Sequence, residues 1–217
     1  MYQTVFLKIS LPTLLFILVC CSVKNDRKNL PYYNTPDFTP HFIASAKEVQ
    51  EKITHYISSF SFTNQHGKQV NEKDVENKIH IASFIFTRCE SICPVMTKHL
   101  KLLQDEFKNK NEVVILSYSV TPWIDSVARL KEYADANEIT SPNWHLLTGS
   151  KSEIYTLARQ SYFAEEDLGF TKDSTEFLHT EHILLVDKTK RIRGIYNGTL
   201  QLEIEQLIRD INLLKDE

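Results

Sequence analysis

The chain has 217 residues, with 25 basic and 28 acidic side chains and a formal net charge of −3. This slight negative charge and the lack of a basic block argue against nucleic acid as a partner. Once an N-terminal export segment and a spacer are set aside, about 160 residues remain, which is enough for one domain with a single hydrophobic core.

The N-terminus has the pattern of an export signal. After Lys8, residues 9–19 are apolar apart from Ser10 and Thr13 and include Pro12. This apolar run is shorter than the roughly 20 residues that span a bilayer, which favours a cleaved signal peptide over a transmembrane helix. A short uncleaved anchor is the other interpretation.

The end of this segment resembles the lipidation site of bacterial lipoproteins. Cys21 fits that pattern best, because Leu18 lies three positions before it and Cys20, a small residue, directly before it. Cys20 is the alternative lipidated residue. We therefore expect residues 1–21 to be a lipoprotein-type signal peptide. The mature protein would be an extracytoplasmic lipoprotein, held on the periplasmic side of a bacterial membrane.

Residues 22–40 have the composition of a tether. Pro31, Pro36 and Pro40 occur in this stretch together with several Asn and Asp residues. Such a composition predicts an exposed spacer that holds a domain off the membrane. Residues 41–217 are then the folded domain.

Within the domain, short apolar segments alternate with segments of helical periodicity. Strands are predicted at 60–62, 79–86, 113–120 and 144–147, and a hairpin at 183–186 and 192–196, while helices are predicted at 95–107, 127–136, 151–162 and 200–214. No clear period is found over residues 163–178. This order predicts an α/β domain of thioredoxin-like type. Its central sheet is expected to be mixed and mostly parallel, flanked by helices, with a terminal β-hairpin and a C-terminal helix.

Two cysteines lie where the strand at 79–86 gives way to the next helix. Pro94 suits the first turn of that helix, so Cys93 should lie at its N-terminus and Cys89 in the loop before it. The spacing turns both sulfurs to one side, where the helix dipole favours a thiolate. In an oxidising compartment the pair can also form a redox-active disulfide. A purely structural disulfide is the less favoured alternative, since so short a loop adds little stability.

Several motifs together resemble the Sco/SenC family, from about residue 37 to residue 214. They are FSFTNQHGK at 60–68, FTRCESICP at 86–94, Ser119-Val120 with Pro122 and Asp125, WHLLTG at 144–149, and His179-Thr180 before the hairpin. The resemblance implies a thioredoxin-like fold that binds one copper ion through two cysteines and a distant histidine. It also implies a role in assembling the CuA centre of cytochrome c oxidase. On this chain the cysteine ligands would be Cys89 and Cys93.

The histidine ligand implied by the resemblance is His179. In the family this ligand opens a His-Ser or His-Thr pair that shortly precedes a strand, and His179-Thr180 matches that arrangement. His182 would begin the strand itself, and we interpret it as a surface residue or one that supports the site.

Three positions depart from the family pattern. They are Leu178, where an acidic residue is usual, Thr121, where Asp is usual, and residues 188–190, where Pro-Asp-Gly is usual. None of them is an expected ligand, so the metal assignment stands. They put in doubt the fine tuning of the histidine and the preference for partners.

The chemistry of the expected ligands also favours copper. Two thiolates and one imidazole suit Cu(I) and can hold Cu(II), whereas zinc usually takes a fourth ligand. The expected partners are the CuA-bearing subunit of the oxidase, an upstream copper donor or thiol reductant, and the membrane through a lipid anchor.

The main alternative is an enzyme, a thiol-disulfide oxidoreductase acting on cysteines of the oxidase subunit or of other exported proteins. Such enzymes usually have two residues between their cysteines and a proline just before the hairpin. Here three residues lie between the cysteines, and no proline follows Pro142. A carrier is therefore favoured over an enzyme.

Overall fold

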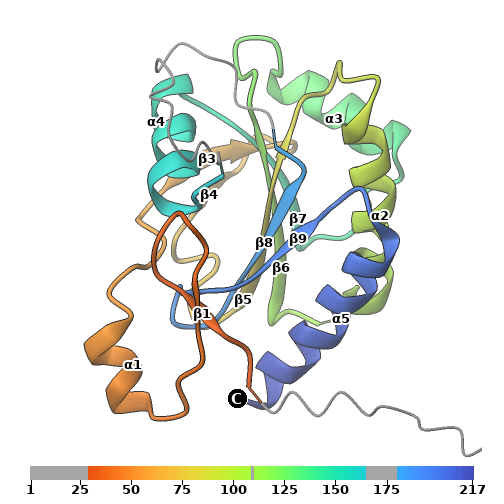
Figure 1. Ribbon diagram of the computed structural model, residues 1–217. Helices are drawn as coiled ribbons and strands as arrows, with labels where there is room; N and C mark the ends of the chain where they lie inside the picture. The colour runs from red at the N-terminus through yellow and green to blue at the C-terminus, as the bar shows by residue number, and fades with distance from the viewer. Residues whose placement is uncertain (1–28, 109, 165–179) are drawn as a thin grey trace, which may run out of the picture.

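The computed structural model describes residues 29–108, 110–164 and 180–217 (Figure 1). Its strands are β1 Tyr32–Tyr33, β2 Pro40–His41, β3 Ser61–Asn64, β4 Gln69–Asn71, β5 Ile79–Ile85, β6 Val113–Ser119, β7 Trp144–Thr148, β8 His182–Val186 and β9 Ile192–Asn197. Its helices are α1 Ala46–Lys52, α2 Ile92–Phe107, α3 Val127–Ala136, α4 Lys151–Thr156 and α5 Gln201–Asp216, and a π-helical turn, η1 Leu157–Ser161, continues α4. Among these described residues, no helix has the length and apolar character needed to cross a membrane.

The described strands form one mixed sheet in the order β2-β1-β9-β8-β5-β6-β7-β3-β4. Parallel pairing joins β5 to β6 and β6 to β7, while every other pair of neighbouring strands in this sheet is antiparallel. The α/β class and the mixed sheet are confirmed, but the parallel part is confined to the centre. The reason is that each edge is extended by a hairpin, β8-β9 on one side and β3-β4 on the other, and hairpins return antiparallel.

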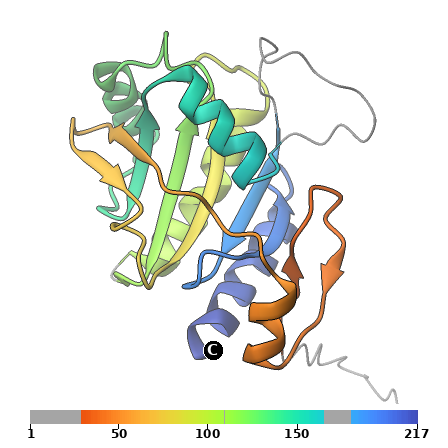
Figure 2. The ribbon, with the colours of Figure 1, turned by 90° about the vertical axis from the view of Figure 1, so that its left-hand side faces the viewer.

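Helices cover both faces of this sheet. On one face α2, α3 and α5 bury residues such as Met96, Leu130 and Ile204. On the other face, which is turned toward the viewer in Figure 2, α4 and η1 bury Ile154 and Leu157. The central strands β5 and β6 are buried at every position, as expected of strands covered on both sides.

The expected exposed spacer does not extend as far as residue 40. Leu30 is only 1% exposed, and β1 pairs with β9 through Tyr33 and Ile192. The prediction was wrong for this stretch because strands of two residues leave no periodic signal and are stabilised by contacts distant in sequence. Helix α1 was also not predicted, since it has seven residues and buries only Val49.

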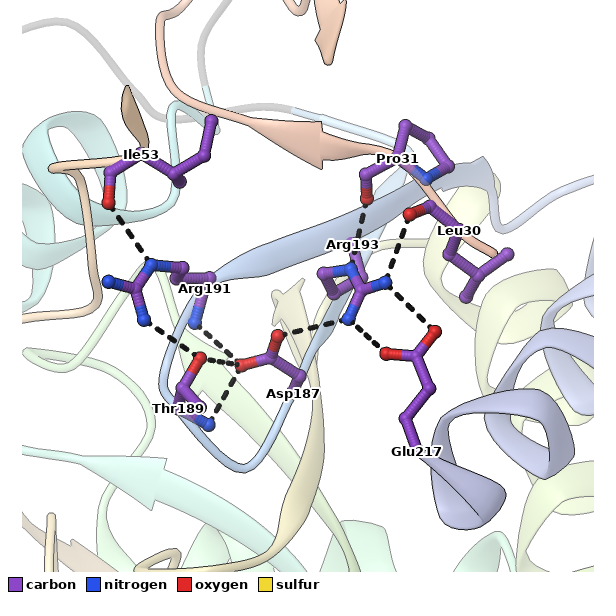
Figure 3. Close-up of polar contacts among 8 residues, drawn as sticks. All are labelled: Leu30, Pro31, Ile53, Asp187, Thr189, Arg191, Arg193 and Glu217. Carbon is purple, nitrogen blue, oxygen red and sulfur yellow. Dashed lines mark hydrogen bonds and ion pairs between the residues drawn. The ribbon is translucent and has the colours of Figure 1, made fainter. Parts of the chain in front are cut away.

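One buried side chain holds this N-terminal strand in place (Figure 3). The Arg193 guanidinium, 2% exposed, donates hydrogen bonds to the carbonyl oxygens of Leu30 (2.9 Å) and Pro31 (3.1 Å). It also donates to the carboxylates of Asp187 (3.2 Å) and Glu217 (2.7 and 3.1 Å). We call this set of contacts the Arg193 clamp. It fixes the start of the described domain and its C-terminus against the β8-β9 turn.

Candidate metal centre

The two cysteines lie in and beside the loop that joins β5 to α2. The Cys89 N–H donates to the Phe86 carbonyl at 3.0 Å, which forms a tight turn directly after the strand. Helix α2 begins at Ile92, so Cys93 lies in its first turn, as the sequence predicted. Cys93 is buried, Cys89 is half-buried, and they are not joined by a disulfide.

The Cys89 sulfur accepts hydrogen bonds at the start of α2. Burial raises the pKa of this thiol, but hydrogen bonds from the N–H groups of Cys93, Ser91 and Ile92 and from the Cys93 side chain outweigh burial, and the net pKa lies below its ordinary value. The Ser91 side chain makes no capping hydrogen bond, so the Cys89 sulfur satisfies N–H groups that a helix otherwise leaves without partners. This environment favours a thiolate on Cys89.

Cys93 behaves in the opposite way. Its pKa is raised to about 12, and burial is the largest cause. The backbone of Phe86 lowers the pKa through a hydrogen bond, whereas the hydrogen bond with Cys89 and the negative charges of Cys89 and Asp125 raise it. The pair therefore favours one thiolate and one thiol that hydrogen-bond to each other. A metal ion that binds both sulfurs must displace the proton of Cys93.

A buried carboxylate supports the cysteine loop from the next loop of the same edge. Asp125 accepts hydrogen bonds from the hydroxyls of Thr87 (2.5 Å), Ser119 (2.6 Å) and Thr121 (2.9 Å). The Arg129 Nε donates to the Thr87 hydroxyl at 2.7 Å and lies 3.8 Å from the Asp125 carboxylate. The sequence indicated Asp125 only as part of a family motif, because nothing in the spacing of these residues shows that they meet.

The third expected ligand, His179, lies outside the described residues, as do Leu178 and the expected lipidation residues Cys20 and Cys21. Thr180 is the next described residue, and it lies two residues before β8 begins. Because β8 is antiparallel to β5, the start of β8 lies at the edge of the sheet where β5 ends and the cysteine loop begins. The chain thus returns to the thiol edge directly after residue 179.

His182 is half-buried rather than on the surface. Its ring lies edge-on to Phe38, with centroids 6.2 Å apart, and its Nδ1 is buried without a hydrogen-bond partner. Within residues 29–108, 110–164 and 180–217, no three His, Cys, Asp or Glu side chains gather so that they could hold a metal ion. Of the three expected ligands, the described part of the chain contains only Cys89 and Cys93.

Comparison with known proteins identifies the family. The family model SCO1/SenC matches residues 48–215. The SCO1 protein homolog of Bacillus subtilis is 33% identical over 167 residues, which cover 76% of this chain and 86% of the relative.

Solved structures agree with this match. A SCO1/SenC family lipoprotein from Bacillus anthracis str. Ames is 30% identical with a TM-score of 0.65, and the match covers 75% of this chain and 96% of the other. BsSco, a member of the Sco family of cytochrome c oxidase assembly proteins in which a disulfide switch was identified, is 32% identical with a TM-score of 0.62, covering 74% and 93%. Bradyrhizobium japonicum ScoI, solved with copper bound, is 25% identical with a TM-score of 0.55, covering 73% and 99%. The chain belongs to the SCO1/SenC family.

Proposed function

We propose that this protein is a membrane-tethered extracytoplasmic copper chaperone that delivers one copper ion to the CuA site of cytochrome c oxidase. The observation that carries the proposal is the pair of hydrogen-bonded thiols of Cys89 and Cys93 at the start of α2. A relative in the family, Bradyrhizobium japonicum ScoI, was solved with copper bound. Another, BsSco, is described as a member of a family of cytochrome c oxidase assembly proteins.

The donor set fits copper. The two sulfurs contact each other through a hydrogen bond, so they are close enough to share one ion. Sulfur donors are soft ligands, which Cu(I) prefers, and an added imidazole suits both Cu(I) and Cu(II).

We assign the imidazole to His179. The position of Thr180 supports this assignment, because Thr180 follows His179 in the sequence and lies just before β8 begins at the thiol edge. His182 is the second candidate, because its Nδ1 is buried and makes no hydrogen bond.

The two sulfurs would play different parts in uptake and release. Cys89 is the more exposed and the more easily ionised, so an incoming ion or a recipient's ligand meets it first. Cys93 then loses its proton as the ion binds. Copper is the cargo here, and a site with few ligands can pass it on by ligand exchange.

The membrane tether is part of the same proposal. Residues 1–21 would form the lipoprotein-type signal segment, cleaved so that Cys21 stays on the mature protein and carries the lipid, with Cys20 as the alternative. The lipoprotein of Bacillus anthracis in the same family supports this reading. The partners would be the CuA-bearing subunit, an upstream copper donor or thiol reductant, and the membrane.

A thiol-disulfide oxidoreductase is the second candidate function. The easily ionised Cys89 beside the thiol of Cys93 is an arrangement that can attack a disulfide. The disulfide switch described for the relative BsSco also favours it. On this reading the cysteine pair reduces cysteines of the oxidase subunit or of other exported proteins.

Metal analysis of the purified, reduced protein tests the main proposal. We expect one copper per chain, and we expect Cys89→Ser or Cys93→Ser to abolish stable binding while the protein stays folded. Glu90→Gln, an exposed change in the same loop, is the matched control and should keep the copper. A cysteine variant that unfolds would show that the pair is structural.

Oxidase assembly in cells separates the two candidate functions. A copper donor needs all three ligands, so His179→Ala should block assembly although both cysteines are intact, and added copper should partly restore it. His182→Ala should have much less effect on assembly and on the Cu(II) spectrum. Normal assembly with His179→Ala, together with failed assembly with Cys89→Ser, would favour the oxidoreductase.

A further inference from the structure

The carboxylate of Asp125 lies behind the cysteine loop and is not one of the proposed ligands. It is fully buried, at 0% exposure. Burying a carboxylate is unfavourable unless hydrogen bonds and nearby charge compensate the loss of water. Its hydrogen bonds therefore show what this costly group is placed to hold.

These hydrogen bonds join the loop after β5 to the loop after β6. Thr87 follows β5 and lies two residues before Cys89, whereas Ser119 ends β6 and Thr121 is in the loop after it. The Thr87 hydroxyl donates to Asp125 and accepts from Arg129, so its side chain is held from two sides.

A backbone hydrogen bond and a charge effect add to this link. The Val120 N–H donates to the Ile85 carbonyl at 2.9 Å, which continues the strand pairing up to the cysteine loop. The charge of Asp125 acts on Cys93 in the first turn of α2. The Asp125 carboxylate therefore holds the cysteine loop through Thr87 and acts on the first turn of α2 through its charge.

We propose that Asp125 is a positioning residue, which acts through Thr87 to hold the cysteine loop so that the sulfurs of Cys89 and Cys93 stay side by side. The inference rests on the proposed function where it concerns copper. Where it concerns the thiol pair it stands alone, because two sulfurs that are held together close a disulfide more readily than two that move apart.

Asn cannot replace this carboxylate without loss. Three hydroxyl groups donate to the two oxygens of Asp125, whereas an amide offers one oxygen and turns an NH₂ group toward a hydroxyl donor. Asp125→Asn should therefore release Thr87 or one of the other hydroxyls. Thr87→Val removes the link from the other side and leaves the carboxylate in place.

Disulfide exchange with glutathione measures the effect without copper. In this exchange the two protein thiols give two electrons and two protons to glutathione disulfide, a Cys89–Cys93 bond forms, and two glutathione molecules are released. We expect Asp125→Asn and Thr87→Val to shift the equilibrium toward the dithiol at least tenfold, about 30 mV in reduction potential.

Copper binding to the full protein is the second measurement. We expect both variants to bind copper at least tenfold more weakly and to change the Cu(II)-thiolate absorption band. The matched control is Asp210→Asn on α5, another buried carboxylate, which accepts hydrogen bonds from Tyr196 of β9 and Gln206 of α5. It should lower stability but keep the wild-type potential and spectrum.

The outcomes distinguish this inference from the proposed function. If Asp125→Asn and Thr87→Val keep the wild-type glutathione equilibrium and copper spectrum, Asp125 has only a structural role and the inference is overturned. If the wild-type protein binds no copper but both variants shift the glutathione equilibrium, the proposed function fails and the positioning role stands. Should Asp125→Asn fail to fold, Thr87→Val alone decides the question.

Discussion

Removing the buried imidazole of His80 should change how the stability of this protein depends on pH. His80 lies in β5 and is 1% exposed, with its Nε2 hydrogen-bonded to the Tyr162 hydroxyl at 3.1 Å and its Nδ1 without a partner. Burial, assisted by the positive charge of Lys190, lowers the pKa of His80 to about 3. The folded protein therefore keeps this ring neutral over the whole mildly acidic range.

The ordinary pKa of histidine, 6.5, applies to the unfolded chain. Below that pH the imidazole of His80 binds a proton in the unfolded chain but stays neutral in the folded protein. Protonation therefore stabilises only the unfolded chain, and the stability present above pH 6.5 is lost as the pH falls. Each pH unit lowers the free energy of unfolding by about 1.4 kcal/mol until the folded pKa is reached. Between pH 6.5 and 4.5 this single group should cost about 3 kcal/mol.

Urea unfolding of the wild type and His80→Leu at pH 7.5 and pH 4.5 measures this effect. At pH 7.5 the two should agree within about 1 kcal/mol, because leucine removes a nitrogen without a partner and Tyr162 keeps its hydrogen bond with Tyr118. At pH 4.5 the variant should be more stable by about 3 kcal/mol. His66→Asn removes an exposed imidazole and should retain the full wild-type loss. If His80→Leu loses as much stability as the wild type on acidification, His80 is not held neutral by burial and the reasoning fails.

Two further changes test the packing around β9. Arg193→Met leaves the buried Asp187 carboxylate without its cation, so the free energy of unfolding should fall by about 3 to 5 kcal/mol. Amide hydrogen exchange over residues 29–41 should become faster, while the copper content stays unchanged. Continued protection of that segment from exchange would contradict the role of the Arg193 clamp. Gly194→Ala places a Cβ 2.4 Å from the Tyr196 hydroxyl. The Tyr196 ring must therefore move and break the 2.7 Å hydrogen bond from its hydroxyl to Asp210. We expect the free energy of unfolding, measured by chemical denaturation, to fall by about 1 to 3 kcal/mol. This loss should exceed the loss caused by Tyr196→Phe, which removes the hydrogen bond alone.

The elements that the sequence predicted well are those whose signal is local. The apolar runs of β5 and β6 and the periodicity of α3 each decide their own structure, and α3 matches the predicted 127–136. The cysteine pair was placed correctly because strand, loop and helix start are consecutive in the sequence. The hairpin of β8 and β9 was predicted for the same reason. By contrast, the antiparallel pairings of β8 with β5 and of β3 with β7 join strands that are distant in sequence, and local pattern does not report which strands become neighbours.

The support around the thiols was beyond prediction for a related reason. Thr87 and Asp125 are 38 residues apart, and each is an ordinary polar residue in its own surroundings. Their hydrogen bond exists because β5 and β6 are adjacent and parallel, so that the loops after them meet at one edge. Only the assembled sheet shows that contact.

The Arg193 clamp has a consequence for how the protein faces its surroundings. The clamp holds the chain at Leu30 through a hydrogen bond from Arg193. This contact lies near the end of the sheet where β5 begins, because Asp187 of the clamp directly follows Val186, which pairs with His80 of β5. The thiols follow the opposite end of β5, and a strand of this length spans about 20 Å. In a protein anchored through its first residues, as proposed, the chain would join the domain at the end of the sheet opposite to the thiols. The thiol edge would then be separated from the point of attachment by the length of β5, which leaves it free for a recipient in the aqueous space.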